Sequence, residues 1–415
     1  MREMKDSGVE WLGEVPAGWG VVPGKRILVL LQRPVEDDDG VITCFRDGEV
    51  TLRVHRRIDG FTVALKEIGY QGIKPGDLVV HGMDGFAGSI GISDSRGKAS
   101  PVLNVMDSDQ NKRFLMYYMR GLAYRDVYMA LSDGIRVRSC NLSWKKIANL
   151  LFALPPLPEQ RRIAGYLDEK CAEIDRAVSA AEQTIEEYKA YKNSVVYRAV
   201  TKGLDADAPM KDSGVEWLCE VPVGWGLRQV GQLADQTKTP NKGMVESNLL
   251  SLSYGKIKRR DIYATDGLLP ASFETYNIIE PDDIVFRFTD LQNDQKSLRV
   301  GRVTERGIIT SAYVTVRPFD PSCSRFLYYA LHAYDLRKGF YGMGAGVRQG
   351  LKWQEAKYIK LPWPGNVDRG RIADYLDEKC SQIDTAIAAK QAIIADLKAY
   401  KQSLIYETVT GKREV

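Results

Sequence analysis

The feature that most constrains the fold of this chain is an internal duplication. Residues 5–19 read KDSGVEWLGEVPAGW and residues 211–225 read KDSGVEWLCEVPVGW, so 13 of the 15 positions are identical. A second matching pair is IAGYLDEKCAEID (163–175) with IADYLDEKCSQID (372–384), and a third is YKAYKNSVVY (188–197) with LKAYKQSLIY (397–406). Chance does not produce three matches in one order. The chain therefore consists of two copies of a unit of about 207 residues.

The segments between these repeats are variable blocks that retain a common pattern. KPGDLVV (74–80) corresponds to EPDDIVF (280–286), and each is a turn signal followed by a strand-like run. RFLMY (113–117) corresponds to RFLYY (325–329), and a tryptophan, Trp144 or Trp353, precedes a Leu-Pro pair in each block. We therefore predict that both blocks have one α/β (α+β) fold and differ in their surface residues.

The repeated segments after the blocks are predicted to be long helices. Between Ile163 and Thr201 the sequence has no proline, and Lys202-Gly203 supplies a stop signal. Apolar residues recur at steps of three and four, as in a coiled-coil seam. The seam positions are Leu167, Cys171, Ile174, Val178, Ala181, Ile185, Tyr188, Val195 and Ala199 in the first copy, and Leu376, Cys380, Ile383, Ile387, Ile394, Leu397 and Leu404 in the second.

Two equal units on one chain are most simply related by a pseudo-twofold axis, which makes the two helices an antiparallel pair. Two unrelated core helices would explain the heptads less well. Lys192 and Lys401 occupy the same seam position in both copies. Each lysine either lies at a frayed end, marks the register, or extends its ammonium group to solvent.

The predicted domains follow the repeat. Their order is an N-terminal repeat motif (1–19), a first variable block (20–158), a long helix (159–203), a linker with the second motif (204–225), a second variable block (226–366) and a second long helix (367–415).

Composition excludes several classes of protein. Apolar residues make up 44% of the chain, enough for packed cores, and no apolar run approaches the ~20 residues that cross a membrane. The six cysteines form no CxxC pair and there are three histidines, which argues against a disulfide scaffold and the usual zinc modules. The first residues, MREMKD, do not resemble a secretory signal. We expect a soluble, reduced, cytoplasmic protein.

The charge distribution points to a polyanion as partner. Residues 20–158 hold 19 Lys/Arg against 15 Asp/Glu, and residues 226–366 hold 20 against 14, although the whole chain has a net charge of only +4. Each block has a basic run that is either a solvated face or a phosphate contact, and each has side chains of the base-reading types. The candidate DNA-binding residues are Arg53, Arg56, Arg57, Arg136, Arg138 and Asn141 in the first block, and Lys256, Lys258, Arg259, Arg260, Arg348 and Gln349 in the second.

We find no catalytic signature in the sequence. GFAGSIG (85–91) is not followed by a helix pattern, so we interpret it as a turn in a β-rich block rather than a nucleotide loop. Asp282-Asp283 lacks the spaced Glu-x-Lys of a nuclease and is interpreted as a turn. Tyr254 and Tyr263, which flank the second basic run, either pack on the sugars of a nucleic acid or fill the core.

The order of these elements resembles the specificity subunit of type I restriction–modification enzymes. The resemblance rests on a variable block, LPPLPEQRRIA (154–164), a long helix and KDSGVEWLxEVPxGW, followed by a second block and helix, and it covers essentially the whole chain. Residues 251–353 also look like one class of that family's target recognition domain. The second copy departs from the pattern at LPWPGNVDRGRI (361–372), which lacks a Glu-Gln pair and leaves the start of the second helix open.

The resemblance implies a protein that reads DNA for its partners and has no catalytic site of its own. Each recognition domain would read one half of a split, asymmetric site in double-stranded DNA. The helices would set the spacing and hold two DNA methyltransferase (M) subunits that bind S-adenosylmethionine. Restriction (R) subunits, which use ATP and Mg, would join the complex. No cofactor on this chain and no membrane partner are expected.

Two rival functions remain at this point. One is a coiled-coil scaffold that binds protein or RNA through its basic blocks, and the other is an enzyme concealed in the blocks. A steep salt dependence of duplex-DNA binding would argue against the first, because phosphate contacts release counterions. Cleavage or methylation by the isolated chain would support the second.

Overall fold

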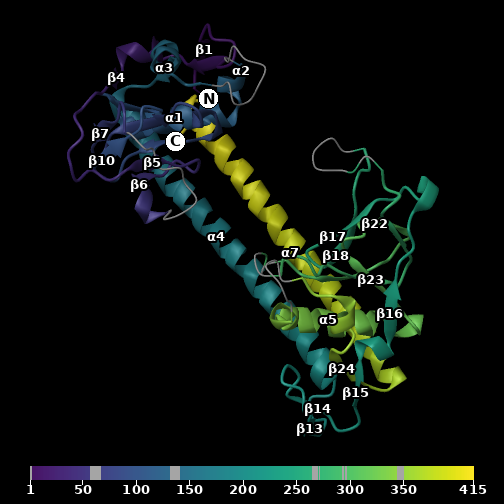
Figure 1. Cartoon of the computed structure of the whole chain (residues 1–415). Coiled ribbons are helices and arrows are strands. Elements are labelled where there is room, and N and C mark those ends of the chain that lie inside the picture. Colours follow the sequence, from purple (N-terminus) through teal and green to yellow (C-terminus); the bar gives the residue numbers. More distant parts are fainter. Residues whose placement is uncertain are drawn as a thin grey trace. The chain divides into compact units, whose positions relative to one another are not determined.

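A computed structural model describes residues 2–56, 67–130, 141–263, 270, 272–291, 294, 297–343 and 350–415 (Figure 1). The chain forms two compact units: unit 1 contains Met1–Glu182 and Gln391–Val415, and unit 2 contains Gln183–Lys390. Each unit thus combines one variable block with the first part of one long helix and the last part of the other.

The two long helices are α4 (Leu157–Lys202) and α7 (Asn366–Val409). Both begin at the same position of the repeat, so the different sequence ahead of the second helix does not shift its start. At this start, Arg369 makes the same contact in the second copy as Gln160 makes in the first. Arg369 donates a hydrogen bond to the carbonyl oxygen of Pro364 at 2.7 Å, and Gln160 donates one to that of Pro155 at 2.8 Å. Gly203 and Gly411, at φ +77° and +74°, follow the two helix ends, where a left-handed residue commonly closes a helix.

The two blocks have the same strand topology. The four-stranded sheet of unit 1 has the order β4-β11-β8-β9, and that of unit 2 has the order β16-β23-β20-β21, with antiparallel pairing throughout. The bounds in unit 1 are β4 (Val29–Leu30), β8 (Leu78–His81), β9 (Ile90–Ile92) and β11 (Leu103–Asp107). Those in unit 2 are β16 (Ala234–Thr237), β20 (Ile284–Phe286), β21 (Val300–Arg302) and β23 (Val314–Pro318).

In the described parts of the two blocks, four two-stranded sheets accompany each four-stranded sheet, again with the same connections. In unit 1 they pair β1 (Met4–Asp6) with β2 (Glu14–Pro16), β3 (Gly20–Pro23) with β12 (Leu151–Leu154), β5 (Ile42–Cys44) with β6 (Val50–Leu52), and β7 (Gln71–Ile73) with β10 (Gly97–Ala99). In unit 2 they pair β13 (Met210–Asp212) with β14 (Glu220–Pro222), β15 (Gly226–Gln229) with β24 (Lys360–Trp363), β17 (Leu250–Ser253) with β18 (Lys256–Arg259), and β19 (Asn277–Ile279) with β22 (Gly307–Ile309). The prediction of one α/β fold for both blocks is confirmed.

Each block also has one longer helix that docks on a long helix of its unit. In unit 1 this is α1 (Lys112–Tyr124), where Arg113 and the Tyr117 hydroxyl donate hydrogen bonds to Asp168 of α4 at 2.6 and 2.8 Å. Shorter helices in that unit are α2 (Val127–Ala130) and α3 (Trp144–Asn149).

Unit 2 repeats this docking with α5 (Ser324–Leu336), and its short helix is α6 (Trp353–Ala356). Arg325 and the Tyr329 hydroxyl donate hydrogen bonds to Asp377 of α7 at 2.9 and 2.7 Å. The arginine and tyrosine belong to the corresponding RFLMY and RFLYY segments, and both aspartates belong to the repeated IAxYLDEKC sequence. One set of contacts therefore attaches both blocks.

Apolar side chains of the two blocks form small cores at matching positions. In unit 1 the core residues are Ile42, Cys44, Val50, Ile73, Val79, Ala99, Leu103 and Val105. In unit 2 they are Leu250, Leu252, Ile279, Val285, Val303 and Ile309. Most predicted seam residues are buried: Leu167, Ile174, Val178, Ile185, Leu376, Ile383, Ile394 and Leu404. Val195 and Ile387 are only half-buried.

Ion pairs cross between the long helices within each unit. In unit 1, Lys401 contacts Asp175 at 2.6 Å and Lys398 contacts Glu182 at 3.2 Å, so the numbering rises along α4 as it falls along α7. This order makes the segments antiparallel, as predicted. In unit 2, Lys192 contacts Asp384 at 2.7 Å. The seam lysines therefore pair with repeat-equivalent aspartates.

Within the described part of the chain, none of the helices combines the length and the apolar character needed to cross a membrane.

Candidate nucleic-acid interface

The basic run of unit 2 lies on β18 of its hairpin, whereas the basic run of unit 1 begins directly after β6 of the equivalent hairpin. The backbone N–H of Arg53, just after β6, donates to the carbonyl oxygen of Val41 at 2.8 Å. The N–H of Arg260, just after β18, donates to the carbonyl oxygen of Leu249, also at 2.8 Å. Arg53 and Arg260 thus occupy the same place in the fold, which the sequence alone indicated only as a similar depth from the start of each block.

The hairpin of unit 2 exposes its four predicted basic residues. Lys256 forms an ion pair with Asp384 of α7 at 2.8 Å, and Arg259 contacts Glu305 through both its Nε and Nη2 atoms. The Arg259 guanidinium holds the pKa of Glu305 below its usual range. Lys258 and Arg260 have no ion-pair partner among the residues that the structure describes.

In unit 1, Arg53 and Arg56 of the basic run contact side chains of their own hairpin. Arg53 is half-buried, and its Nε atom donates to the Thr43 hydroxyl at 3.2 Å. Arg56 contacts Asp47 and Glu49, each at 2.7 Å, and its guanidinium lies over the ring of Phe45 at 4.2 Å from the centroid. A phosphate that approached Arg56 would have to compete with two carboxylates.

Five predicted residues, Arg57, Arg136, Arg138, Arg348 and Gln349, lie outside the described residues.

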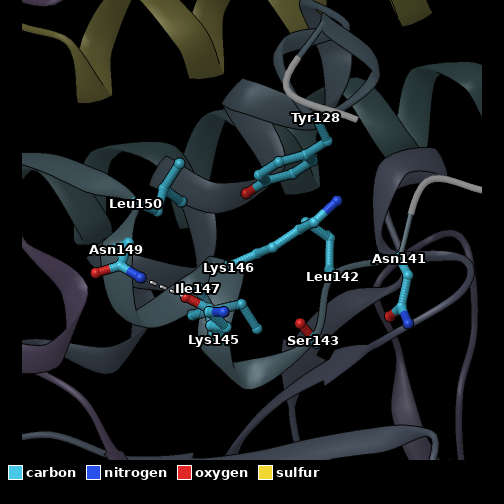
Figure 2. A pocket seen from close by; sticks show the side chains of 9 residues that line it. All are labelled: Tyr128, Asn141, Leu142, Ser143, Lys145, Lys146, Ile147, Asn149 and Leu150. Carbon is cyan, nitrogen blue, oxygen red and sulfur yellow. Dashed lines mark hydrogen bonds between the residues drawn. The ribbon is translucent and has the colours of Figure 1, made fainter. Parts of the chain in front are cut away.

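A pocket of about 420 Å³ in unit 1 contains the last predicted residue of the first block, Asn141 (Figure 2). Two hydrogen bonds fix the neighbouring backbone: Leu142 N–H donates to the Gly82 carbonyl oxygen at 2.7 Å, and Asn104 Nδ2 donates to the Leu142 carbonyl oxygen at 2.9 Å. Asn141 itself is exposed. The lining residues are Tyr128, Asn141, Leu142, Ser143, Lys145, Lys146, Ile147, Asn149 and Leu150.

The two lysines of this pocket were not predicted from the sequence. Lys145 and Lys146 lie on the short helix α3 (Figure 2), directly after Trp144, which marked only the end of the block. The adjacent Lys-Lys pair in SWKKIAN was the signal that could have identified them. With Asn141 they place two cationic side chains beside an amide that can both donate and accept hydrogen bonds, a suitable combination for phosphate and base edges.

The loops considered for catalysis have structural roles. Gly85–Ala87 forms one 3₁₀ turn and leads into β9, as interpreted from the sequence. Asp283 is buried and accepts hydrogen bonds from Arg317 at 2.7 and 2.8 Å, and Asp282 pairs with Arg302 at 2.6 Å. Among the described residues, no group of three or more His, Cys, Asp or Glu could hold a metal ion.

The chain is similar in sequence to two curated type I restriction specificity subunits. It is 33% identical over 163 residues to the specificity subunit of the Escherichia coli EcoBI enzyme, a match that spans 38% of this chain and 33% of that protein. It is 21% identical over 435 residues to the putative MjaX specificity subunit of Methanocaldococcus jannaschii, covering 97% and 96% of the two chains. No family model matches the chain.

Solved structures show the same fold. A chain from a type I restriction–modification system, solved to explain complex assembly and conformational transition, superposes with a TM-score of 0.70 at 14% identity, covering 96% of this chain and 99% of that one. The HsdS subunit of Thermoanaerobacter tengcongensis gives a TM-score of 0.50 at 16% identity, covering 96% and 98%. The resemblance stated from the sequence motifs and the predicted fold class are confirmed.

Proposed function

We propose that this chain is the DNA-reading subunit of a type I restriction–modification complex. The observation that carries the proposal is that the two blocks have the same fold but expose different side chains. Both units hold an equivalent hairpin with basic residues on or directly after its second strand, but the side chains differ between the two units. Two unlike surfaces in one framework suit the two halves of an asymmetric DNA site, since each block contacts its own base edges.

The chain itself would have no catalytic role. Its partners would be two DNA methyltransferase subunits, which carry S-adenosylmethionine, and restriction subunits, which use ATP and Mg. The complex would act in the cytoplasm, where it meets DNA. The names of the similar proteins support these partners, and the repeated sequences of the long helices offer two equivalent surfaces for two copies of one subunit.

Methylation mapping tests the proposal. The chain and its methyltransferase would be expressed in a host without restriction systems, and modified bases would be read along the genome by single-molecule sequencing. We expect a split motif with one modified adenine in each half. A continuous palindrome, or no new methylation that depends on this chain, would contradict it. Methylation or cleavage by the isolated chain would instead favour an enzyme, and preferential binding of RNA or protein would favour the scaffold.

A further inference from the structure

The hairpin of unit 2 ends in an unusual turn. Ser253 pairs with Lys256, so the loop between β17 and β18 contains only Tyr254 and Gly255. Their φ angles are +47° and +75°, as in a type I′ turn, which requires positive φ at both central positions. Asn, Asp or Gly usually occupies the first of these positions, because a side chain such as that of tyrosine is strained in the left-handed region.

The strained tyrosine is also exposed. Tyr254 has 71% of its surface accessible to solvent and is therefore not a core residue. A tyrosine at this position lowers the stability of the turn without burying its ring in the folded chain. Strained residues that persist in a fold are candidates for a functional role. The exposure thus rules out the core-filling role that the sequence left open for Tyr254.

Two contacts and the close packing of Gly255 hold the turn in place around the exposed ring. The Tyr328 hydroxyl donates to the Gly255 carbonyl oxygen at 3.4 Å, and Lys256 contacts Asp384 at 2.8 Å. A Cβ atom added at Gly255 would lie 3.1 Å from the Leu298 side chain, which shows how closely this glycine is packed. The tip is therefore anchored on one side and presents Tyr254 on the other, a preorganised arrangement for binding.

The chemistry of the same hairpin suggests what the ring contacts. Lys258 and Arg260 on and after β18 are exposed cations suited to phosphate, and a two-stranded ribbon fits the major groove of B-DNA, which is about 12 Å wide. Apolar side-chain atoms contact base surfaces there, the thymine methyl group above all. The equivalent hairpin of unit 1 has a longer loop, and its Phe45 ring is covered by Arg56.

We propose that Tyr254 is a base-contacting residue that enters the major groove and determines specificity in the half-site read by unit 2. This proposal rests on the proposed DNA-reading function. The ring would contribute affinity through apolar contact with a base, and the neighbouring cations would contribute it through phosphates. Because unit 1 presents no such ring at its own tip, the effect would be confined to one half of the site.

The test compares variants of the full chain in complex with the methyltransferase. The probe is a duplex that carries the split motif found by methylation mapping. Tyr254→Asn creates the Asn-Gly sequence that this turn prefers and should leave the protein as stable as before or more stable. We expect about ten-fold weaker binding by Tyr254→Asn, an unchanged salt dependence, and near wild-type binding by Tyr254→Phe. Lys258→Ala should instead reduce the salt slope by about one unit.

Tyr358→Asn is the matched control, since Tyr358 is another exposed tyrosine of unit 2, at 60%, and lies outside the hairpin. Wild-type affinity of the Tyr254→Asn variant, or an equal loss in Tyr358→Asn, would overturn the assignment of Tyr254. So would a loss of the same size on a duplex in which the half-site read by unit 2 has been permuted. Failure of the wild-type complex to bind the duplex at all would overturn the proposed function as well.

Discussion

The Tyr406 hydroxyl donates a hydrogen bond to the backbone carbonyl oxygen of Trp11 at 3.3 Å, across 395 residues of sequence. Tyr197 and Trp217, which hold the equivalent repeat positions, make the same contact at 3.0 Å only 20 residues apart. The C-terminal part of α7 therefore contacts the first repeat motif in the same way as the C-terminal part of α4 contacts the second repeat motif. Unit 1 is built from both ends of the chain (Figure 1).

This closure predicts that a fragment of residues 1–209 forms a homodimer. The fragment lacks residues 391–415, whose Ile405 and Val409 lie close to Gly121 of α1. It contains Val196 and Val200 at the equivalent positions, and a second copy could insert them into the vacant site. Leaving that apolar surface in water would be unfavourable by about 25 cal/mol per Å². Sedimentation should show a dimer.

With the methyltransferase, this dimer should modify an inverted repeat of the half-site read by unit 1. A well-folded monomer would contradict the exchange of helix segments. Methylation of the original asymmetric site by the dimer would contradict the assignment of one half-site to each block.

The contact between Arg259 and Glu305 gives a second prediction: removing the basic side chains and removing the acidic one should change DNA affinity in opposite directions. Replacing Arg259 and Arg260 by Ala should weaken DNA binding and reduce the salt slope by about one unit for each lost phosphate contact. Glu305→Gln removes the carboxylate that neutralises Arg259, so this variant should bind DNA more tightly at low salt. Binding titrations over a range of salt concentrations measure both. Unchanged slope in the double variant would exclude these arginines as contacts.

The ion pair between Lys192 and Asp384 gives a third prediction. Burial alone would raise the pKa of Asp384, but hydrogen bonds from Lys192 and Lys256 outweigh it and hold the pKa below its usual range. In the unfolded chain an aspartate has a pKa of about 3.9, and this carboxylate contributes fully to the free energy of unfolding above that pH. The contribution is lost as the pH falls through the lower pKa that Asp384 has in the folded chain.

A double-mutant cycle with Lys192→Ala and Asp384→Ala should give a coupling of about 0.2–1 kcal/mol at pH 7, because both side chains are partly exposed. Denaturant unfolding measures it. The cycle of Lys401 with Asp175 is the matched comparison, and a coupling that persists at pH 2 would contradict the electrostatic origin.

Asp335 on α5 predicts a pH dependence of the opposite sign. Burial raises its pKa to about 6, and among the described residues one of its carboxylate oxygens, Oδ1, has no hydrogen-bond partner. The folded chain binds this proton more tightly than the unfolded chain, so the associated stability is present below about pH 3.9 and is lost as the pH rises through about 6. Relative to Asp335→Asn, the wild-type protein should lose free energy of unfolding between pH 4 and 7. Parallel pH profiles for the two proteins would show that Asp335 is not responsible.

Exchange of residues 226–360 for the corresponding block of a related protein should alter one half-site only. The block contributes its own hairpin and core, and it attaches through Arg325 and Tyr329 to Asp377. Methylation mapping of the chimaera would show which bases changed. A change in both halves would mean that the two blocks depend on each other.

Much of the fold could be predicted from the sequence because the duplication repeats its strongest patterns. Heptads in both copies predicted the long helices, and the short matches between blocks predicted a common topology. Lys192 remained ambiguous, since a lysine in a seam can be solvated, buried or paired. The repeat contained the answer: Lys192 and Lys401 are equivalent, and so are Asp175 and Asp384.

The candidate site was less predictable. Basic side chains were recognised by type, but the partners of Arg56 and Arg259 depend on tertiary contacts between segments up to 46 residues apart. The sequence SLSYGKIKRR has the glycine of a two-residue hairpin but not the Asn, Asp or Gly that usually precedes it, and it does not show that Tyr254 is strained and exposed. That combination follows only from the backbone angles and the packing of Gly255.

The docking of each block on its helix has a consequence for inheritance. The accepting aspartates, Asp168 and Asp377, lie in repeated sequence, whereas the donating arginines and tyrosines belong to the blocks. Recombination between genes at the repeats would replace a block and leave its acceptor unchanged. Any incoming block that carries Arg-x-x-x-Tyr on its helix would find the same acceptor in either half of the gene. Under the proposed function, a lineage could thus acquire a new recognition sequence in one genetic event, without altering the two long helices.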